Sequence, residues 1–136
     1  ALQDDQFTVG LSVIHAMAAS QLYFDPEPTV AKWQEWMERG TKELPLVWTH
    51  ASGRKSLVLG NTASHVVGMD PLESTGLLIR LREWATQPQF SYSHKWSVGD
   101  AVMWDNTGTL HRATPYPADC GRMLHRTKLE GEEAIV

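Results

Sequence analysis

The sequence has little of several features that mark other classes of protein. It contains one cysteine, Cys120, which excludes an internal disulfide and any cysteine-rich metal site. No apolar run approaches the ~18 residues that a membrane-spanning helix needs, and the N-terminus shows neither a basic stretch nor the apolar core of a signal peptide. We therefore expect a cytoplasmic protein with no membrane partner.

Clusters of basic residues are also missing. The chain has 12 Lys and Arg against 16 Asp and Glu, and its formal net charge is −4. Because nucleic-acid binding needs a basic patch or stripe, this distribution argues against DNA and RNA as partners. No repeat or linker interrupts the 136 residues, of which 42% are hydrophobic and 21% charged. This composition and length predict one globular domain, residues 1–136.

Two helices are expected in the first third of the chain. Apolar residues recur at three- and four-residue steps over residues 2–20, which predicts a helix with one buried face and a structural role for His15 near its end. A proline-rich loop follows. A short helix is then expected over residues 30–39, with Trp33 and Trp36 on one side for core or interface contacts.

A third helix is announced by Asp70-Pro71-Leu72-Glu73. This sequence combines a capping carboxylate, a proline at the first helical position and a glutamate three residues after the cap. Leucines continue the apolar stripe to about Ala85, and Pro88 ends the helical pattern.

Strands are indicated by apolar residues that alternate with polar ones. The pattern predicts a hairpin with a glycine-containing loop over residues 46–59 and a short strand at 64–67. Further strands are expected at 89–96, 101–104 and 122–129. Strands that follow one another across short turns predict an α+β, β-rich fold, an antiparallel sandwich or jelly roll with flanking helices.

Chemistry-bearing residues concentrate in the stretch from Trp104 to His111 and in the last predicted strand. Histidine is a common metal ligand and a common general base, so His111 alone decides little. Arg122 and Arg126 are four residues apart, which puts both side chains on one face of a strand, about 13 Å apart. Two guanidinium groups on one face are either exposed to solvent or directed into a cavity that holds an anion.

These residues resemble the C-terminal part of the Fe(II)- and 2-oxoglutarate-dependent dioxygenases related to taurine dioxygenase and 2,4-dichlorophenoxyacetate dioxygenase. The segment 49–57, Thr-His-Ala-Ser-Gly-Arg-Lys-Ser-Leu, resembles a hairpin of that family, without its proline and about one residue shorter. The other similar segments, in order, are residues 64–69, 86–90, 96–100 and 104–106, and then His111, Arg122 and Arg126. Most of residues 45–131 fits this pattern.

The resemblance implies a role for each of three residues. His111 would be the distal histidine ligand of the iron, and Arg122 would hold the C5 carboxylate of 2-oxoglutarate. Arg126 would lie near the anionic group of the substrate or assist with the cosubstrate. A guanidinium fork matches a carboxylate or sulfonate in a bidentate manner. Asp105 and Asn106 are interpreted as turn residues that fix His111.

One departure from the family pattern limits what this chain can do. Iron in such enzymes is held by two histidines and one carboxylate, and the family supplies two of these ligands from a His-x-Asp pair. None of the six histidines here has an acidic residue two positions later. We therefore expect an incomplete jelly roll, the C-terminal half of a larger dioxygenase domain whose first half is absent, cleaved off or unseen.

The reaction implied by the resemblance uses Fe(II), 2-oxoglutarate and O2 to hydroxylate a small anionic substrate, with release of succinate and CO2. Sulfonates, alkyl sulfates and aryloxyalkanoates are the substrate types of relatives. We also expect a homo-oligomer, a dimer or a tetramer. An alternative is a non-catalytic anion-binding or assembly module with a degenerate metal site. A serine-histidine hydrolase is a third option, although the Gly-x-Ser-x-Gly motif is missing.

Overall fold

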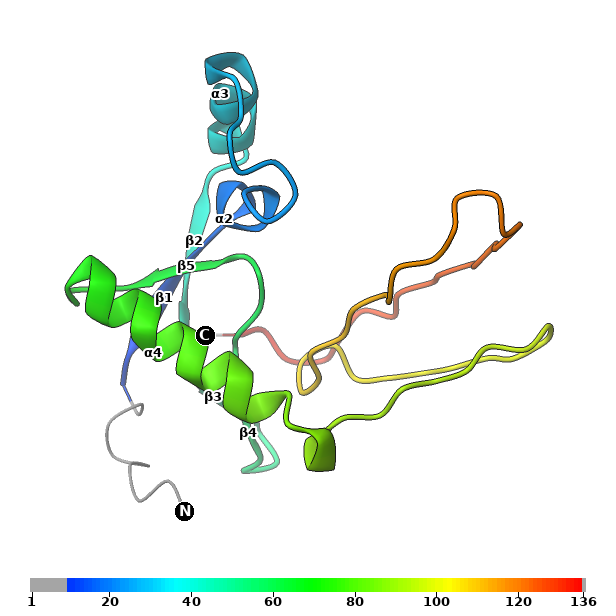
Figure 1. Ribbon diagram of the computed structural model, residues 1–136. Coiled ribbons are helices and arrows are strands. Elements are labelled where there is room, and N and C mark those ends of the chain that lie inside the picture. Colours follow the sequence, from blue (N-terminus) through cyan, green and yellow to red (C-terminus); the bar gives the residue numbers. More distant parts are fainter. Residues whose placement is uncertain (1–9, 136) are drawn as a thin grey trace.

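The computed structural model describes residues 10–135, which form a packed body followed by a long extended segment (Figure 1). Residues 11–90 contain every helix and strand of the described chain. In order, these are β1 (Ser12–Ala16), α2 (Met17–Gln21), α3 (Val30–Glu38), β2 (Thr41–Pro45), β3 (Val47–Thr49), β4 (Lys55–Leu57), β5 (Ala63–Val66), α4 (Pro71–Ala85) and the short 3-10 helix η1 (Pro88–Phe90). The fold class is α+β with antiparallel sheets, as predicted.

The central strand of the body lies where a helix was expected. β1 pairs antiparallel with β2 on one side and β5 on the other, so Val13 is aligned with both Leu44 and Val66. The prediction of a helix over residues 2–20 is wrong for residues 12–16, and only Met17–Gln21 is helical. Two ladders of hydrogen bonds and the β-branched pair Val13-Ile14 favour the strand over local helical periodicity. Residues 2–9 of that expectation lie outside the described residues.

The edge strand β2 was not predicted. Its sequence, Thr-Lys-Glu-Leu-Pro, has no alternation of apolar and polar residues, and its first three residues are exposed. Its strand conformation comes from its pairing with β1. The hairpin that follows is confirmed: β3 and β4 pair antiparallel, with Trp48 opposite Ser56. Gly53 has φ 82°, a left-handed conformation that glycine adopts without strain in this loop.

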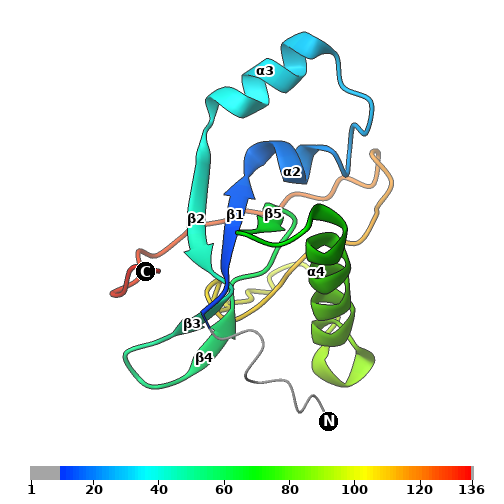
Figure 2. The ribbon, with the colours of Figure 1, turned by 90° about the vertical axis from the view of Figure 1, so that its left-hand side faces the viewer.

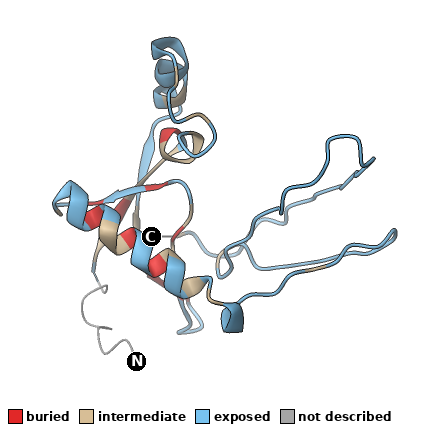
Figure 3. Cartoon of the chain, viewed as in Figure 1, coloured by how far each residue is buried: buried red, intermediate tan, exposed pale blue. Residues whose placement is uncertain are grey.

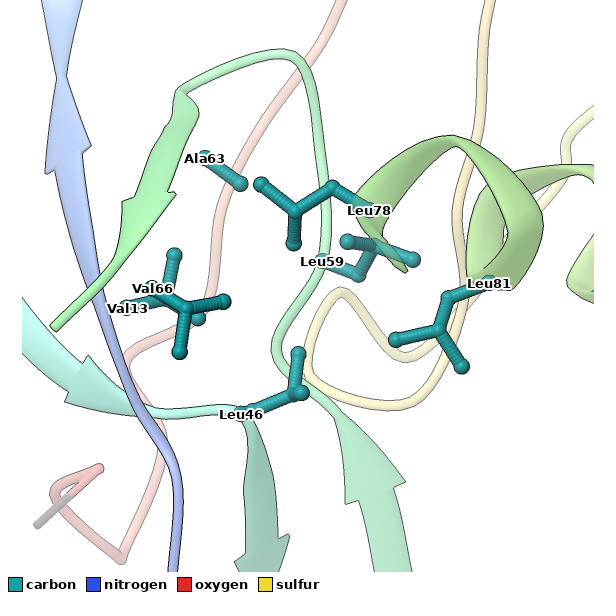
Figure 4. Close-up of a cluster of buried hydrophobic side chains, with 7 residues drawn as sticks. All are labelled: Val13, Leu46, Leu59, Ala63, Val66, Leu78 and Leu81. Carbon is teal, nitrogen blue, oxygen red and sulfur yellow. The ribbon is translucent and has the colours of Figure 1, made fainter. Parts of the chain in front are cut away.

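The core lies between the strands and α4 (Figures 3 and 4). Figure 4 shows side chains from both sides directed into this space. The cluster consists of Val13, Leu46, Leu59, Ala63, Val66, Leu78 and Leu81. Burying one such leucine or valine side chain stabilises the fold by about 1.5–3 kcal/mol. This layer of apolar contacts holds the body together.

The start of α4 is confirmed in detail. The Asp70 carboxylate accepts hydrogen bonds from the backbone N–H groups of Leu72 (2.9 Å) and Glu73 (3.2 Å), and Pro71 occupies the first helical position. One turn later the buried Ser74 hydroxyl accepts a hydrogen bond from the N–H of Val66 at 2.8 Å. This bond ties α4 to β5.

None of the helices in residues 10–135 has the length and apolar character needed to cross a bilayer.

The short helix α3 is confirmed, but it buries none of its side chains in the core. Together with α2 it lies at one end of the sheet (Figure 2). Trp33 remains 40% exposed and faces a hollow of about 490 Å³ between α2, α3, α4 and the sheet. A core role for Trp33 is therefore wrong in this chain, and the expected interface role stays a prediction.

Residues 91–135 contain no strand, although three were expected in this part of the chain. Figure 1 shows the segment running away from the body and returning as extended chain. The predictions of strands at 89–96, 101–104 and 122–129 are wrong for this chain by itself, in which residues 88–90 form η1 and the rest has no regular structure. An alternating pattern specifies which side chains share a face, but a strand also needs a neighbour for its backbone hydrogen bonds. Within residues 10–135, these segments have no such neighbour.

Candidate functional site

His111 lies in the extended segment, directly after a well-defined turn. Its imidazole is exposed, and no hydrogen bond to the rest of the described chain engages it. Its nearest aromatic neighbour is Trp104, with ring centroids 5.1 Å apart and planes tilted by 52°. The side chain of Trp104 is itself fixed, because its indole N–H donates to the Oδ1 atom of Asn106 at 2.8 Å. The imidazole nitrogens of His111 are therefore available to a ligand from outside this segment.

The turn before His111 is organised by Asp105. Its Oδ1 atom accepts hydrogen bonds from the backbone N–H (2.8 Å) and the hydroxyl (2.6 Å) of Thr107, and its carbonyl accepts from the hydroxyl of Thr109 (2.5 Å). The hydrogen bonds from Thr107 and then the Arg54 guanidinium hold the pKa of Asp105 far below its ordinary value. The interpretation of Asp105 and Asn106 as turn residues is confirmed.

Arg54, in the β3–β4 hairpin, connects this turn to the body. Its Nη2 atom lies 2.6 Å from Oδ2 of Asp105 and 3.3 Å from Nε2 of His50. Its guanidinium also packs on Gly108, where a Cβ atom would lie only 3.1 Å from Nη1. A side chain at position 108 would press on the guanidinium, so the glycine allows the turn and the hairpin to approach closely.

His50 anchors the hairpin end of this contact. The residue is only 6% exposed, stacks against Trp48 with centroids 3.9 Å apart, and has its Nε2 atom 2.7 Å from the Ser56 hydroxyl. Its Nδ1 atom lies 3.8 Å from the carboxylate of Glu133, which also accepts a hydrogen bond from the N–H of Ala51 at 2.8 Å. The hairpin therefore contacts both the turn before His111 and the end of the chain.

Arg122 and Arg126 lie on the returning part of the extended segment, and both are exposed. The Arg122 guanidinium carbon lies 4.3 Å from the centre of the Tyr116 ring, a cation–π contact. Within residues 10–135, no carboxylate pairs with either arginine. Both guanidinium groups can therefore bind an anionic partner. Within the described chain, no contact joins either arginine to His111.

His15 and His94 have structural surroundings, as expected for His15. His15 Nδ1 lies 2.9 Å from the Thr62 hydroxyl, and burial lowers its pKa. His94 Nε2 lies 3.1 Å from Asp100 and its ring packs edge-on against Trp96. His65 lies on β5, next to the hollow that Trp33 faces, and its role stays open.

A metal ion would find only part of a binding site here. Among residues 10–135, no three His, Cys, Asp or Glu side chains come together to hold one. The donor set still fits a share of an iron and 2-oxoglutarate site: one imidazole without a hydrogen-bond partner and two guanidinium groups without an ion-pair partner among residues 10–135, all on the same segment. The remaining ligands of such a site would have to come from other residues.

The contact between Arg54 and Asp105 was not predicted from the sequence. The position of Arg54 in a glycine-containing turn is typical of an exposed residue, and nothing in the local pattern links it to Asp105, which lies far along the chain. The one available signal was Asp105 itself, an acidic turn residue close to the candidate histidine His111. Only the fold shows that the two charges meet.

Comparison with known proteins gives concordant results. A sequence profile of the family described as "Taurine catabolism dioxygenase TauD, TfdA family" matches residues 3–128. An alpha-ketoglutarate-dependent 2,4-dichlorophenoxyacetate dioxygenase of Burkholderia sp. (strain RASC) is 50% identical over 88 residues, which cover 64% of this chain and 30% of that protein. An (S)-phenoxypropionate/alpha-ketoglutarate-dioxygenase of Sphingobium herbicidovorans is 43% identical over 91 residues, 66% of this chain and 32% of that protein.

Two solved structures also resemble this chain in fold and sequence. The crystal structure of AAD-2 in complex with Mn(II) and N-oxalylglycine matches with a TM-score of 0.61 and 31% identity, over 71% of this chain and 38% of that chain. A crystal structure of a Burkholderia xenovorans protein matches with a TM-score of 0.64 and 42% identity, over 76% and 40% of the two chains. The alignments thus span about a third of the length of the curated relatives.

Proposed function

Since the chain belongs to the TauD/TfdA dioxygenase family, we propose that it forms part of an Fe(II)- and 2-oxoglutarate-dependent oxygenase. The observation that carries the proposal is the arrangement at the end of the chain. A hydrogen-bonded turn presents the imidazole of His111, and the guanidinium groups of Arg122 and Arg126 follow on the same segment; within residues 10–135 none of the three has a hydrogen-bond or ion-pair partner. Other residues of the complete protein would supply the two remaining iron ligands.

Each of the three residues has a distinct part in this proposal. The His111 imidazole would be one of the residues that hold the iron, with Trp104 beside it limiting the positions of its ring. Arg122 holds the distal carboxylate of 2-oxoglutarate through a bidentate charge-assisted pair. Arg126 orients the anionic group of the substrate or assists with the cosubstrate. When bound, iron and 2-oxoglutarate supply the activation of O2, with hydroxylation of the substrate and release of succinate and CO2.

We further propose a small anionic substrate of the aryloxyalkanoate, alkyl sulfate or sulfonate type. The supporting observations are the unpaired arginines and the relatives, which include 2,4-dichlorophenoxyacetate and phenoxypropionate dioxygenases and, at 31% identity, an alpha-ketoglutarate-dependent sulfate ester dioxygenase of Pseudomonas putida. Exposed aromatic residues such as Tyr92 and Trp104 could provide the apolar wall for such a substrate.

The wider architecture is part of the same proposal. Residues 1–136 would be the C-terminal half of a jelly-roll domain, and the segments at 91–96, 101–104 and 122–129 would become strands when paired with its other half. This pairing would satisfy backbone groups that have no strand neighbour in residues 91–135. The homo-oligomer and the cytoplasmic location remain predictions from the sequence.

Binding of 2-oxoglutarate to the full-length protein, measured without oxygen and with and without Fe(II), tests the function. We expect tight binding only with Fe(II), a visible charge-transfer band, and succinate release with at least one aryloxyalkanoate, alkyl sulfate or sulfonate in air. Affinity for 2-oxoglutarate that does not depend on the metal, without succinate release, would instead support an anion-binding module.

A further inference from the structure

The contact between Arg54 and Asp105 joins two parts of the chain that otherwise have few connections. One is the β3–β4 hairpin, whose buried His50 and Trp48 belong to the packed body. The other is the turn at residues 105–108, which leads directly to His111. The Nη2 atom of Arg54 lies 2.6 Å from the Asp105 carboxylate and 3.3 Å from the His50 ring. The guanidinium therefore joins an element anchored in the packed body to an exposed turn.

We propose that Arg54 is a positioning residue that sets the place of the His111 imidazole through the Asp105 turn, an inference that rests on the proposed function. His111 has no hydrogen bond of its own within the described chain. Its position is determined by the backbone of the turn and by the Trp104 ring beside it. Whatever holds the turn therefore also holds the imidazole.

The contacts at position 54 match the shape of a guanidinium group. Its Nη2 atom reaches both Asp105 and His50, while Nη1 lies over the face of the turn at Gly108. A planar group with several fixed donors can serve these neighbours together, whereas a lysine ammonium is a single point charge on a flexible stem. A lysine at this position would keep the charge and lose the fixed orientation.

Stability is a minor part of this role. The side chains of Arg54 and Asp105 are 52% and 45% exposed, and ion pairs this exposed contribute little to folding. The pair also lies outside the apolar core that holds the body together. Its loss should therefore change where His111 lies more than whether the protein folds.

The test uses the full-length protein with Arg54→Gln, Arg54→Lys and Asp105→Asn, and with Lys55→Gln as the matched control. Lys55 is the exposed neighbour of Arg54 on the hairpin. Three quantities are measured: the Kd for Fe(II) without oxygen, the NMR shifts of the His111 ring protons in the metal-free protein, and the Tm. Trp104 shifts these protons through its ring current as long as the two rings stay in contact.

The proposal predicts that all three Arg54 and Asp105 variants bind Fe(II) about 10-fold more weakly, the low end of what outer-sphere substitutions cost a metal site. The His111 ring protons should move toward their values in a free imidazole, and the Tm should stay with that of Lys55→Gln. Lysine should rescue neither measurement.

One set of results would contradict only the role of Arg54, and another would contradict the proposed function as well. Unchanged Fe(II) affinity and unchanged His111 shifts, or a lower Tm with both unchanged, would overturn the positioning role while leaving the proposed function intact. If the parent protein binds no Fe(II), the proposed function fails, and the claim for Arg54 fails with it. If the glutamine variant does not fold, Arg54→Lys and Asp105→Asn carry the same measurements.

Discussion

Apolar side chains are buried in the body of the chain but exposed in the segment that carries the candidate site. In residues 11–90, Val13, Leu46 and Val66 are fully buried between the sheet and α4. In residues 91–135, Tyr92 is 82% exposed and Met103 is 91% exposed. Both regions have strand-like sequence patterns. The body has partner strands within reach, and the segment after it has none among the described residues.

The two regions therefore differ in how far each is stabilised by contacts within the described chain. The body supplies its own ladder hydrogen bonds and its own core. The segment with His111, Arg122 and Arg126 carries the candidate site residues. Its apolar side chains are exposed, and its backbone groups have no strand neighbour among the described residues. The contact between Arg54 and Asp105 connects the packed region to the segment that carries the candidate site.

The largest expected effect is on the ligand-binding side of the comparison. His111→Ala in the full-length protein should abolish Fe(II)-dependent 2-oxoglutarate binding and succinate release, because it removes the iron ligand proposed for this chain. The Tm of the metal-free protein should not change, since the imidazole is exposed. His125→Ala, an exposed histidine in the same segment, is the control and should keep both activities. Retained turnover in His111→Ala would remove the assignment.

A core substitution should affect the body instead. Leu78, on α4, is 1% exposed, and Leu78→Ala should lower the free energy of unfolding by about 2–5 kcal/mol because it leaves a cavity. The neighbouring Ile79 is 53% exposed, so Ile79→Ala should cost much less. Urea unfolding of both variants measures the difference, and equal losses would contradict the placement of Leu78 in the buried core.

A smaller loss of stability is expected at the start of α4. Asp70→Ala removes the acceptor for two backbone N–H groups and should cost about 1 kcal/mol. Glu83→Gln, at an exposed position of the same helix, should be close to neutral. If thermal unfolding shows no difference between the two variants, the cap does not stabilise the body.

These elements also show what the sequence could predict and why. The cap at Asp70, the hairpin around Gly53 and the turn at Asp105 were predicted because each is set by residues close together in the chain. β1 was predicted as a helix because its strand character comes from two neighbours that lie far away in sequence. The same holds for the Arg54–Asp105 contact. His111 was found through similarity to a family, since its exposed ring alone carries no signal.

The smallest effect concerns pH and the interior of the body. Burial lowers the pKa of His15 below its ordinary value of 6.5, so the unfolded chain binds more protons there than the folded one. Its neutral form supports the fold above pH 6.5, and this support is lost as the pH falls below that value. His15→Gln should therefore flatten the decline of Tm between neutral and mildly acidic pH, whereas an unchanged decline would assign it to other groups.

Hydrogen exchange read by mass spectrometry, on the 136-residue chain and on the full-length protein, tests the central claim most directly. The amides of β1 and of the middle of α4 should be protected in both samples. Those of residues 91–130 should exchange rapidly in the 136-residue chain and become protected in the full-length protein, where the site segment gains strand partners. Protection of residues 91–130 in the 136-residue chain would contradict the account, because the segment would then build its own sheet.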